Sequence, residues 1–140
     1  MSPSEESFLS RRIDASAAPL AVVDVLALAA VLTIGVINHN GVEYLSTAPV
    51  AWLLTLVPFL VGWVVAAPLI GAYSAGAAES SKSAIPLAIR AWVPAAIIGF
   101  VLRASPLFPG GFQLSFGVVI FLTGGVALVV GRWLFFRLFG

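Results

Sequence analysis

The sequence predicts an all-α membrane protein, a bundle of four transmembrane helices. Hydrophobic residues make up 61% of the 140 residues and charged residues only 9%, and the mean hydropathy is +1.10. The apolar residues form four long blocks, and almost every charge lies between the blocks or near their ends. A soluble domain has too little interior to hide so much apolar mass. We therefore expect residues 1–140 to form one integral membrane domain.

Each apolar block is long enough to span a bilayer. A helix needs about 20 apolar residues to cross about 30 Å of hydrocarbon, and the blocks lie at about residues 19–37, 48–73, 84–102 and 113–136. A β-barrel would require alternating apolar and polar positions. Residues 51–67 and 117–130 are instead apolar at nearly every position. The sequence therefore predicts helices, joined by short turns rich in Asn, Gly and Pro.

The basic residues predict the orientation of the bundle. With four spans, both termini and the middle loop lie on one side of the membrane. That side carries Arg11, Arg12, Lys82, Arg132 and Arg137, with Arg90 just inside the third span, whereas the other side carries only Arg103. An excess of basic residues marks the cytoplasmic side. We expect a protein of the cell membrane with both termini in the cytoplasm and residues 1–17 as a flexible cytoplasmic segment.

Asp24 is the most informative single residue because it lies inside the first apolar block. At about 1.5 Å per residue it should lie about 7–8 Å below the interface. A carboxylate at this depth normally faces protein or water and has a partner. The face of the helix that carries Asp24 also carries mostly small or medium-sized apolar residues, which are Ala27, Leu28, Val31 and Gly35. Asp24 should therefore point into the bundle.

Arg90 is the partner that we expect for Asp24. The first and third spans run in the same direction, and the two residues lie at similar distances from the starts of their spans. Arg132 competes for this role, because the fourth span returns to the same leaflet. One interpretation is a buried ion pair or triad that fixes the order of the helices, with Arg132 merely snorkelling toward the interface if Arg90 is the partner. The other interpretation is a functional proton or ion site.

The opposite side of the membrane holds a second polar cluster, formed by His39, Glu43 and Arg103. We interpret these residues as interfacial groups that close the outer end of the bundle. One His and one Glu make a poor metal site, and the chain has a single His and no Cys. The sequence therefore predicts no metal site, no catalytic residue and no cofactor.

Glycine and proline residues in the spans predict how the helices pack and bend. Gly117, Gly124 and Gly131 recur every seven residues, so they should form a groove that lets another backbone approach closely. We favour packing within the molecule over a homodimer interface. The second span has a smaller version of this groove at Gly62. Kinks are expected at three prolines inside the spans, which are Pro58, Pro68 and Pro94.

With these residues in place, the chain resembles a small four-span membrane family of unknown function found in haloarchaea and actinobacteria. The resemblance covers about residues 20–137. It rests on Asp24, on Gly35 followed by His39, on the Pro-Phe-x-x-Gly-Trp motif at residues 58–63, on Arg103, and on Gly-Arg-Trp at residues 131–133. The family pattern carries a basic residue where this chain has Val36. The resemblance implies the fold and the membrane location, and it implies no activity.

These observations favour a multipass membrane protein that serves as a packing, accessory or interaction component. The alternative is a small oligomeric transporter or channel for ions or protons that uses an intramembrane Asp–Arg pair. A membrane enzyme is the third choice, because the sequence carries none of the common nucleotide-binding, metalloprotease or hydrolase motifs. The expected partners are the lipid bilayer and a second copy or another membrane protein. A net charge of +1 offers no basic face for nucleic acid.

Overall fold

The computed structural model describes residues 11–140 and confirms an all-α bundle of four long apolar helices. These helices are α2 (Ala18–Asn40), α4 (Pro49–Ile70), α5 (Ser81–Ala104) and α6 (Leu114–Phe139). Each of them is long and apolar enough to cross a membrane. Shorter elements lie in the connections, which are η1 (Ala15–Ala17), α3 (Tyr44–Thr47) and η2 (Gly76–Ala78). The four predicted spans are therefore confirmed as helices, with ends that differ by a few residues.

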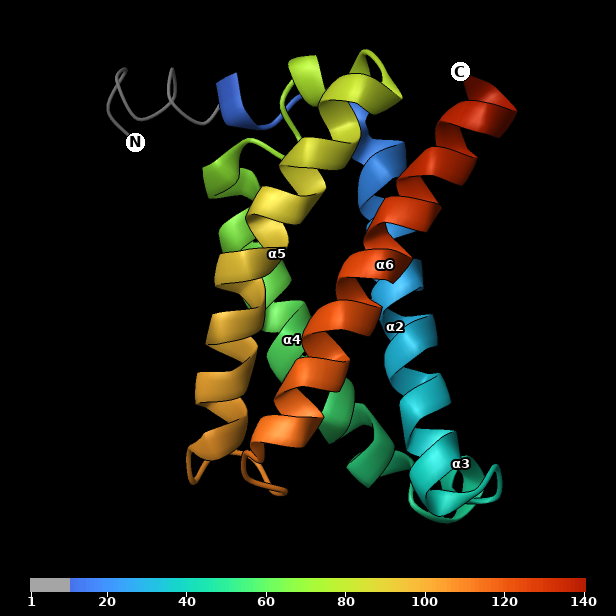
Figure 1. Cartoon of the computed structure of the whole chain (residues 1–140), viewed down its shortest axis with the longest axis vertical. Coiled ribbons are helices and arrows are strands. Elements are labelled where there is room, and N and C mark those ends of the chain that lie inside the picture. The colour runs from blue at the N-terminus through green and yellow to red at the C-terminus, as the bar shows by residue number, and fades with distance from the viewer. Residues whose placement is uncertain (1–10) are drawn as a thin grey trace.

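The four helices form a closed ring in which α2 and α5 lie on one diagonal. Helix α2 packs against α4 and α6, and α5 packs against the same two helices. Figure 1 shows the start of the described chain (blue) and the C-terminus at one end of the bundle, here called the terminal end, together with the turn at residues 71–80. The other end, here called the loop end, carries α3 and the segment at residues 105–113.

The second helix ends earlier than the sequence predicts, at Ile70. Gly71 follows with a φ of 91°, a left-handed conformation that favours glycine. Its N–H donates to the carbonyls of Ala67 and Pro68, at 3.2 and 3.1 Å. This C-cap leaves Tyr73 outside the helix, in a turn that folds back over the terminal end of the bundle.

Residues 11–17, part of the segment that the sequence predicts to be flexible, contact the turn that follows α4. The N–H of Asp14 donates to the carbonyl of Tyr73 at 2.8 Å, and Ile13 forms an isolated bridge with the same residue. Ala17 is fully buried. The backbone of the turn near Tyr73 needs hydrogen-bond partners, and this segment supplies one. Residues 1–10 lie outside the described part of the chain.

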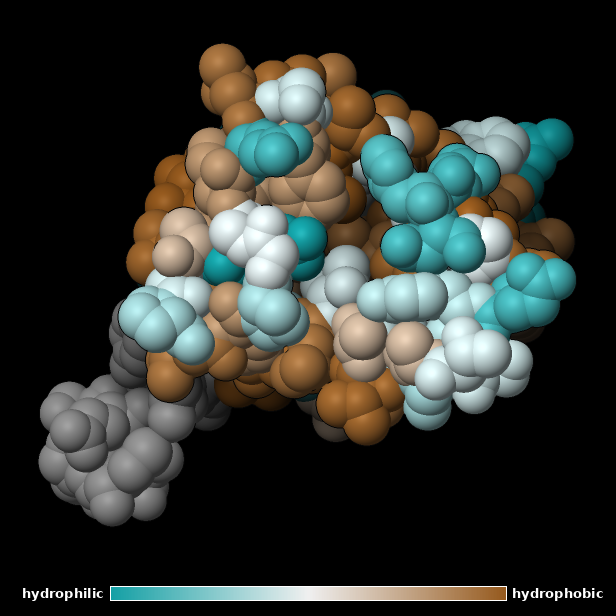
Figure 2. All heavy atoms as spheres, turned by 90° about the horizontal axis from the view of Figure 1, so that it is seen from below, coloured by the Kyte–Doolittle hydropathy of each residue, from teal (hydrophilic) through white to brown (hydrophobic). Residues whose placement is uncertain are grey.

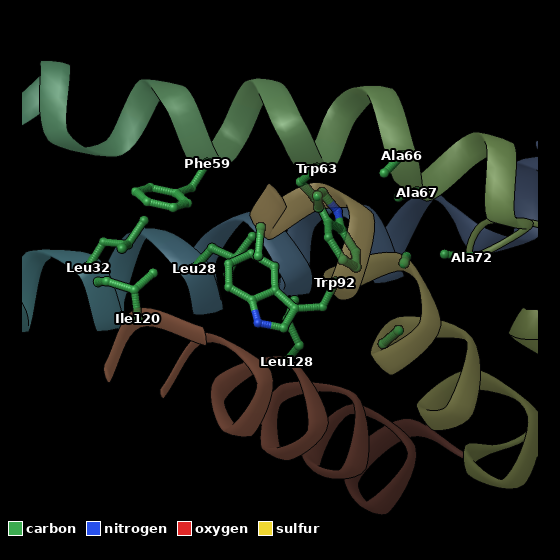
Figure 3. Packing of buried hydrophobic residues seen from close by; sticks show 14 of the residues in the cluster. Leu28, Leu32, Phe59, Trp63, Ala66, Ala67, Ala72, Trp92, Ile120 and Leu128 are labelled. Atoms are coloured by element: carbon green, nitrogen blue, oxygen red, sulfur yellow. The ribbon is translucent and has the colours of Figure 1, made fainter. Parts of the chain in front are cut away.

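Large aromatic side chains fill the centre of the bundle. Phe59, Trp63 and Trp92 are almost completely buried and pack with Leu28 and Leu128, as Figure 3 shows. The Trp92 indole reaches α6, where its Nε1 donates to the carbonyl of Phe121 at 2.8 Å. Trp92 therefore has both an apolar pocket and a hydrogen-bond acceptor inside the bundle.

The backbones of α4 and α5 approach each other closely at Gly62. A Cβ atom on Gly62 would collide with the carbonyl oxygen of Ala95, so only glycine fits. One turn further along α5, Gly99 makes room for the ring of Phe59. Small residues therefore bring α4 and α5 together, as the sequence predicts for Gly62.

The glycine row of α6 does not form one groove for a neighbouring backbone. Gly117 accepts the Phe112 ring, Gly124 accepts the Trp92 indole, and Gly131 packs against Val23 of α2. The row lies inside the molecule, as we expect, but its partners are mainly side chains from several elements. Helix α6 crosses from α5 toward α2 along its length, so no single helix can follow the row (Figure 1).

The prolines do not end the helices that contain them. Helix α4 continues through Pro58 and Pro68, and α5 continues through Pro94. Proline removes one backbone donor, and neighbouring groups in a bundle can compensate for the carbonyl that is set free. The kinks at these positions stay a prediction.

Candidate functional site

The centre of the terminal end is an ion pair between Asp24 of α2 and Arg132 of α6. Arg132 Nε donates to Asp24 Oδ1 at 3.0 Å, and Arg132 Nη2 donates to Asp24 Oδ2 at 2.7 Å. Both side chains have 0% exposure. The two parallel hydrogen bonds form the bidentate geometry in which a guanidinium matches a carboxylate best.

Two backbone carbonyls accept two further hydrogen bonds from Arg132. Nη1 donates to the carbonyl of Ala84 at 2.7 Å, and Nη2 also donates to the carbonyl of Ala72 at 3.1 Å. Ala84 lies in the first turn of α5, and Ala72 lies in the turn after α4. Arg132 therefore joins α6 to each of the other three spans or to the turn that follows one of them.

Tyr73 and Trp63 extend the network. The Tyr73 hydroxyl donates to Asp24 Oδ2 at 2.7 Å and accepts a hydrogen bond from Trp63 Nε1 at 2.6 Å. The Arg132 guanidinium lies over the Tyr73 ring, 5.6 Å from its centroid. Burial, followed by the negative charge of Asp24, raises the pKa of the Tyr73 hydroxyl above its ordinary value. Tyr73 therefore stays protonated and donates to the carboxylate.

The predicted pair between Asp24 and Arg90 is wrong. Arg90 is exposed on α5, and Asp24 pairs with Arg132. Equal depth in the membrane does not make two residues neighbours, because α2 and α5 lie on opposite corners of the ring. The competing partner from α6 is correct, since α6 packs directly against α2. Arg132 is buried in the network and does not snorkel toward the interface.

A pocket of about 430 Å³ opens at the loop end. It lies where α2 and α6, which cross in the upper half of Figure 1, diverge toward the loop end of the bundle. Figure 2 views this end of the molecule, where hydrophilic side chains gather among apolar ones. The polar lining residues are His39, Asn40, Thr55, Arg103, Gln113 and Ser115. The apolar lining side chains are Leu32, Val36, Phe116, Val119 and Ile120.

The structure brings two of the three residues of the predicted cluster of His39, Glu43 and Arg103 to one pocket. His39 and Arg103 line the pocket, but Glu43 does not. Helix α2 ends at Asn40, and Gly41 redirects the chain with a φ of 88°, so the helical spacing between His39 and Glu43 is lost. Within residues 11–140, no group of three His, Cys, Asp or Glu side chains could hold a metal ion.

Sequence reasoning identified the two charged residues of the buried network but missed Tyr73 and Trp63 as members. Tyr73 follows Gly71, and Trp63 lies ten residues earlier in an apolar helix, so their spacing alone does not link them to Asp24. One signal was available. A buried Tyr or Trp needs a hydrogen-bond partner. Asp24 is a carboxylate inside an apolar block, so it was an acceptor available to such a partner.

Comparison with known proteins identifies the family of the chain. The model of a family described as "Protein of unknown function (DUF3054)" matches residues 21–135, which include Asp24, Tyr73, Arg103 and Arg132. No curated protein matches the chain, and no solved structure matches it. With four candidate spans and a family model that covers most of its length, the chain is a multipass membrane protein that belongs to the DUF3054 family.

Proposed function

We propose that this protein is a packing, accessory or interaction component of the cell membrane, in which the Asp24–Arg132 pair has a structural role. Both termini face the cytoplasm in this proposal, in accord with the distribution of basic residues. The protein works as an oligomer or with another membrane protein, and it is not an enzyme.

The observation that supports the structural role is the complete burial of the pair. Arg132 donates four hydrogen bonds to Asp24 and to two backbone carbonyls, and Tyr73 donates a further one to Asp24. The pocket at the loop end does not include Asp24. A carboxylate that carries protons or ions needs access to water and a reason to release its partner. A carboxylate held by a bidentate arginine is better suited to fixing the positions of helices.

Replacement of both charges tests this role. The double variant Asp24→Leu with Arg132→Met keeps side chains of similar size and removes both buried charges, a change that soluble proteins often tolerate. We expect this variant to keep the assembly state of the wild type in mild detergent, and to keep the neighbours that photo-crosslinking detects in native membranes. In vesicles that contain a pH-sensitive dye, the wild type and this variant should show the same proton uptake. The proposal would be overturned if the wild type transported protons or ions and the folded variant did not.

The pocket favours a second candidate function, a small oligomeric transporter or channel. Helices α2 and α6 open toward the loop end, and the buried pair closes the terminal end. A cavity that is open on one side of a membrane is one state of an alternating-access transporter. Four helices rarely enclose a path alone, so transport would require a dimer. A strictly monomeric state in mild detergent would exclude transport, whereas an oligomer is compatible with both functions, so ion or proton flux in vesicles distinguishes the two.

A further inference from the structure

The bundle contains two arginines near its interior, and only one of them has an anionic partner. Arg132 is neutralised by Asp24. Arg103 forms no ion pair with any residue of the described chain, and its buried Nε has no hydrogen-bond partner there. The guanidinium of Arg103 lies over the Phe116 ring, 4.4 Å from its centroid. Stacking uses the face of the guanidinium and leaves its in-plane N–H groups for another acceptor.

The backbone around Arg103 is built to let the guanidinium lie at the pocket wall. Gly110 has a φ of 103°, and a Cβ atom there would lie only 2.6 Å from Arg103 Nη2. Gly111, with a φ of 62°, also lines the pocket, and a Cβ atom there would meet nothing within 4 Å. A side chain at position 110 would displace the guanidinium, so this glycine keeps room for the positive charge.

The rest of the pocket suits an anion that carries an apolar body. No Asp or Glu of residues 11–140 lines it, whereas the side chains of His39, Gln113 and Ser115 add possible donors. The deeper walls are apolar and include Leu32 and Ile120. A volume of about 430 Å³ lies within the range of small-molecule sites, which is about 300–1,000 Å³.

We propose that this pocket binds an amphiphilic oxyanion, with Arg103 as the residue that pairs with its charge. The oxyanion is a carboxylate or a phosphate, because a guanidinium binds both in a bidentate manner. The apolar body lies between α2 and α6. The ligand comes either from solution, as a short aliphatic acid, or from the surrounding leaflet, as an anionic phospholipid. The site is separate from Asp24 and Arg132, so it does not depend on the role of that pair.

Binding experiments with the full chain in a neutral detergent test the proposal. Hexanoate is the free anion, and hexan-1-ol is its uncharged counterpart. Phosphatidylglycerol is the lipid probe, with phosphatidylcholine as the zwitterionic control. Native mass spectrometry counts bound lipid, and thermal unfolding with increasing hexanoate gives the affinity, since a ligand that binds only the folded state raises the midpoint.

Three variants locate the binding. Arg103→Gln removes the charge and should weaken binding of the anionic probe at least tenfold, whereas Arg103→Lys should retain part of it. Arg137→Gln is the matched control, because it makes the same change on an exposed side chain of the last turn of α6. Gly35→Leu keeps Arg103 but fills the pocket from α2, where a Cβ atom on Gly35 would meet nothing within 4 Å. This variant tests the site even if Arg103→Gln fails to fold.

The outcomes separate the two sources. Arg103-dependent binding of hexanoate supports a free acid, and Arg103-dependent retention of phosphatidylglycerol supports a lipid. The proposal is overturned if neither anion binds better than its control. It is equally overturned if Arg103→Gln and Gly35→Leu bind as the wild type does.

Discussion

At the scale of single residues, the molecule depends on how it places two opposite charges in its interior. Removing a carboxylate and a guanidinium from water is costly, and only close geometry with additional hydrogen bonds offsets that cost. Asp24 and Arg132 meet this condition, since Tyr73, Ala72 and Ala84 supply the remaining partners. The pair therefore adds specificity to the bundle, because a different arrangement of helices would leave both charges without partners.

Removal of either charge should destabilise the protein strongly. Asp24→Asn leaves Arg132 without its anion, and Arg132→Gln leaves Asp24 without its cation, a change that costs about 3–5 kcal/mol in soluble interiors. The double variant should lose less than the sum of the two. Thermal unfolding in mild detergent measures the loss of stability in the two single variants and the double variant. Arg90→Gln is the control, because Arg90 is exposed and should change stability little. Strictly additive losses would show that the two residues are not coupled.

Loss of the Tyr73 hydroxyl should destabilise the protein at neutral pH and remove part of its alkaline sensitivity. Tyr73→Phe leaves Trp63 Nε1 without its acceptor, which costs about 1–3 kcal/mol. The pKa of Tyr73 is raised in the folded protein. Above pH about 10, the ordinary pKa of tyrosine, the unfolded chain therefore loses this proton while the folded protein still keeps it. The stability that Tyr73 contributes is complete below pH 10 and is lost as the pH rises further. Unfolding midpoints of both proteins between pH 8 and 12 should therefore converge, and parallel curves would contradict the assignment.

At the scale of secondary-structure elements, small residues determine how closely the helices approach. Helices in lipid gain little hydrophobic energy from association, so they rely on close packing and hydrogen bonds. Between α4 and α5, Gly62 meets the Ala95 carbonyl. Between α5 and α6, Gly124 receives the Trp92 indole, which also donates to the Phe121 carbonyl. In the first interface, glycine lets two backbones come into contact. In the second, glycine leaves space on α6 for an aromatic side chain of α5.

Addition of one methyl group at Gly62 should destabilise the bundle. Gly62→Ala places a Cβ atom against the Ala95 backbone, which cannot move without shifting α5. Overpacking of this kind costs about 1–3 kcal/mol. Gly35→Ala is the matched control, because its Cβ atom meets nothing within 4 Å and alanine is the better helix former by about 1 kcal/mol. Thermal unfolding should therefore shift in opposite directions, and equal shifts would place Gly62 outside a tight contact.

A large side chain at Gly124 should disrupt the contact between α5 and α6. Gly124→Leu would fill the space that the Trp92 indole occupies. We expect lower yield of folded protein and a lower unfolding midpoint, together with a change in Trp fluorescence. Thr123→Leu places the same leucine side chain one position earlier, on an exposed position of α6, and should be tolerated. If both variants behave alike, the interior position of Gly124 is wrong.

At the scale of the whole molecule, the two ends of the bundle differ in their chemistry. The terminal end is closed by the buried ion pair and by residues 11–17, which pack on the turn at Tyr73. The loop end opens into a pocket beside Arg103. The basic residues Arg11, Arg12, Lys82 and Arg137 belong to the terminal end. The bundle is therefore asymmetric along the membrane normal, and its orientation decides which compartment the pocket faces.

Labelling of single cysteines should place the terminal end in the cytoplasm. The chain has no cysteine, so a reporter can be introduced at any exposed position. An impermeant thiol reagent added to intact cells should reach positions near Tyr44 and Gly110, and it should miss Ser80 and the C-terminus. Permeabilised cells should show labelling at all four, which controls for burial. Labelling of Ser80 from outside would reverse the orientation.

The amino-acid sequence by itself determined the number of helices, their approximate bounds and the need for a partner inside the bundle. The length and apolar character of the spans follow from the thickness of the bilayer, and the cost of an unpaired carboxylate requires a partner for Asp24. Only the tertiary structure decided which residue fills that role. Helix order is set by packing of all four helices together, and α6, not α5, lies beside α2.

The tertiary structure also decided the surroundings of residues that look alike in the sequence. Arg90, Arg103 and Arg132 all lie within apolar helices, yet one is exposed, one lines a pocket and one is neutralised in the core. The physical reason is that hydropathy depends on composition along the chain, whereas burial and charge pairing depend on neighbours far away in the sequence. The Asp24–Arg132 contact joins residues 108 positions apart, and no local pattern contains that information.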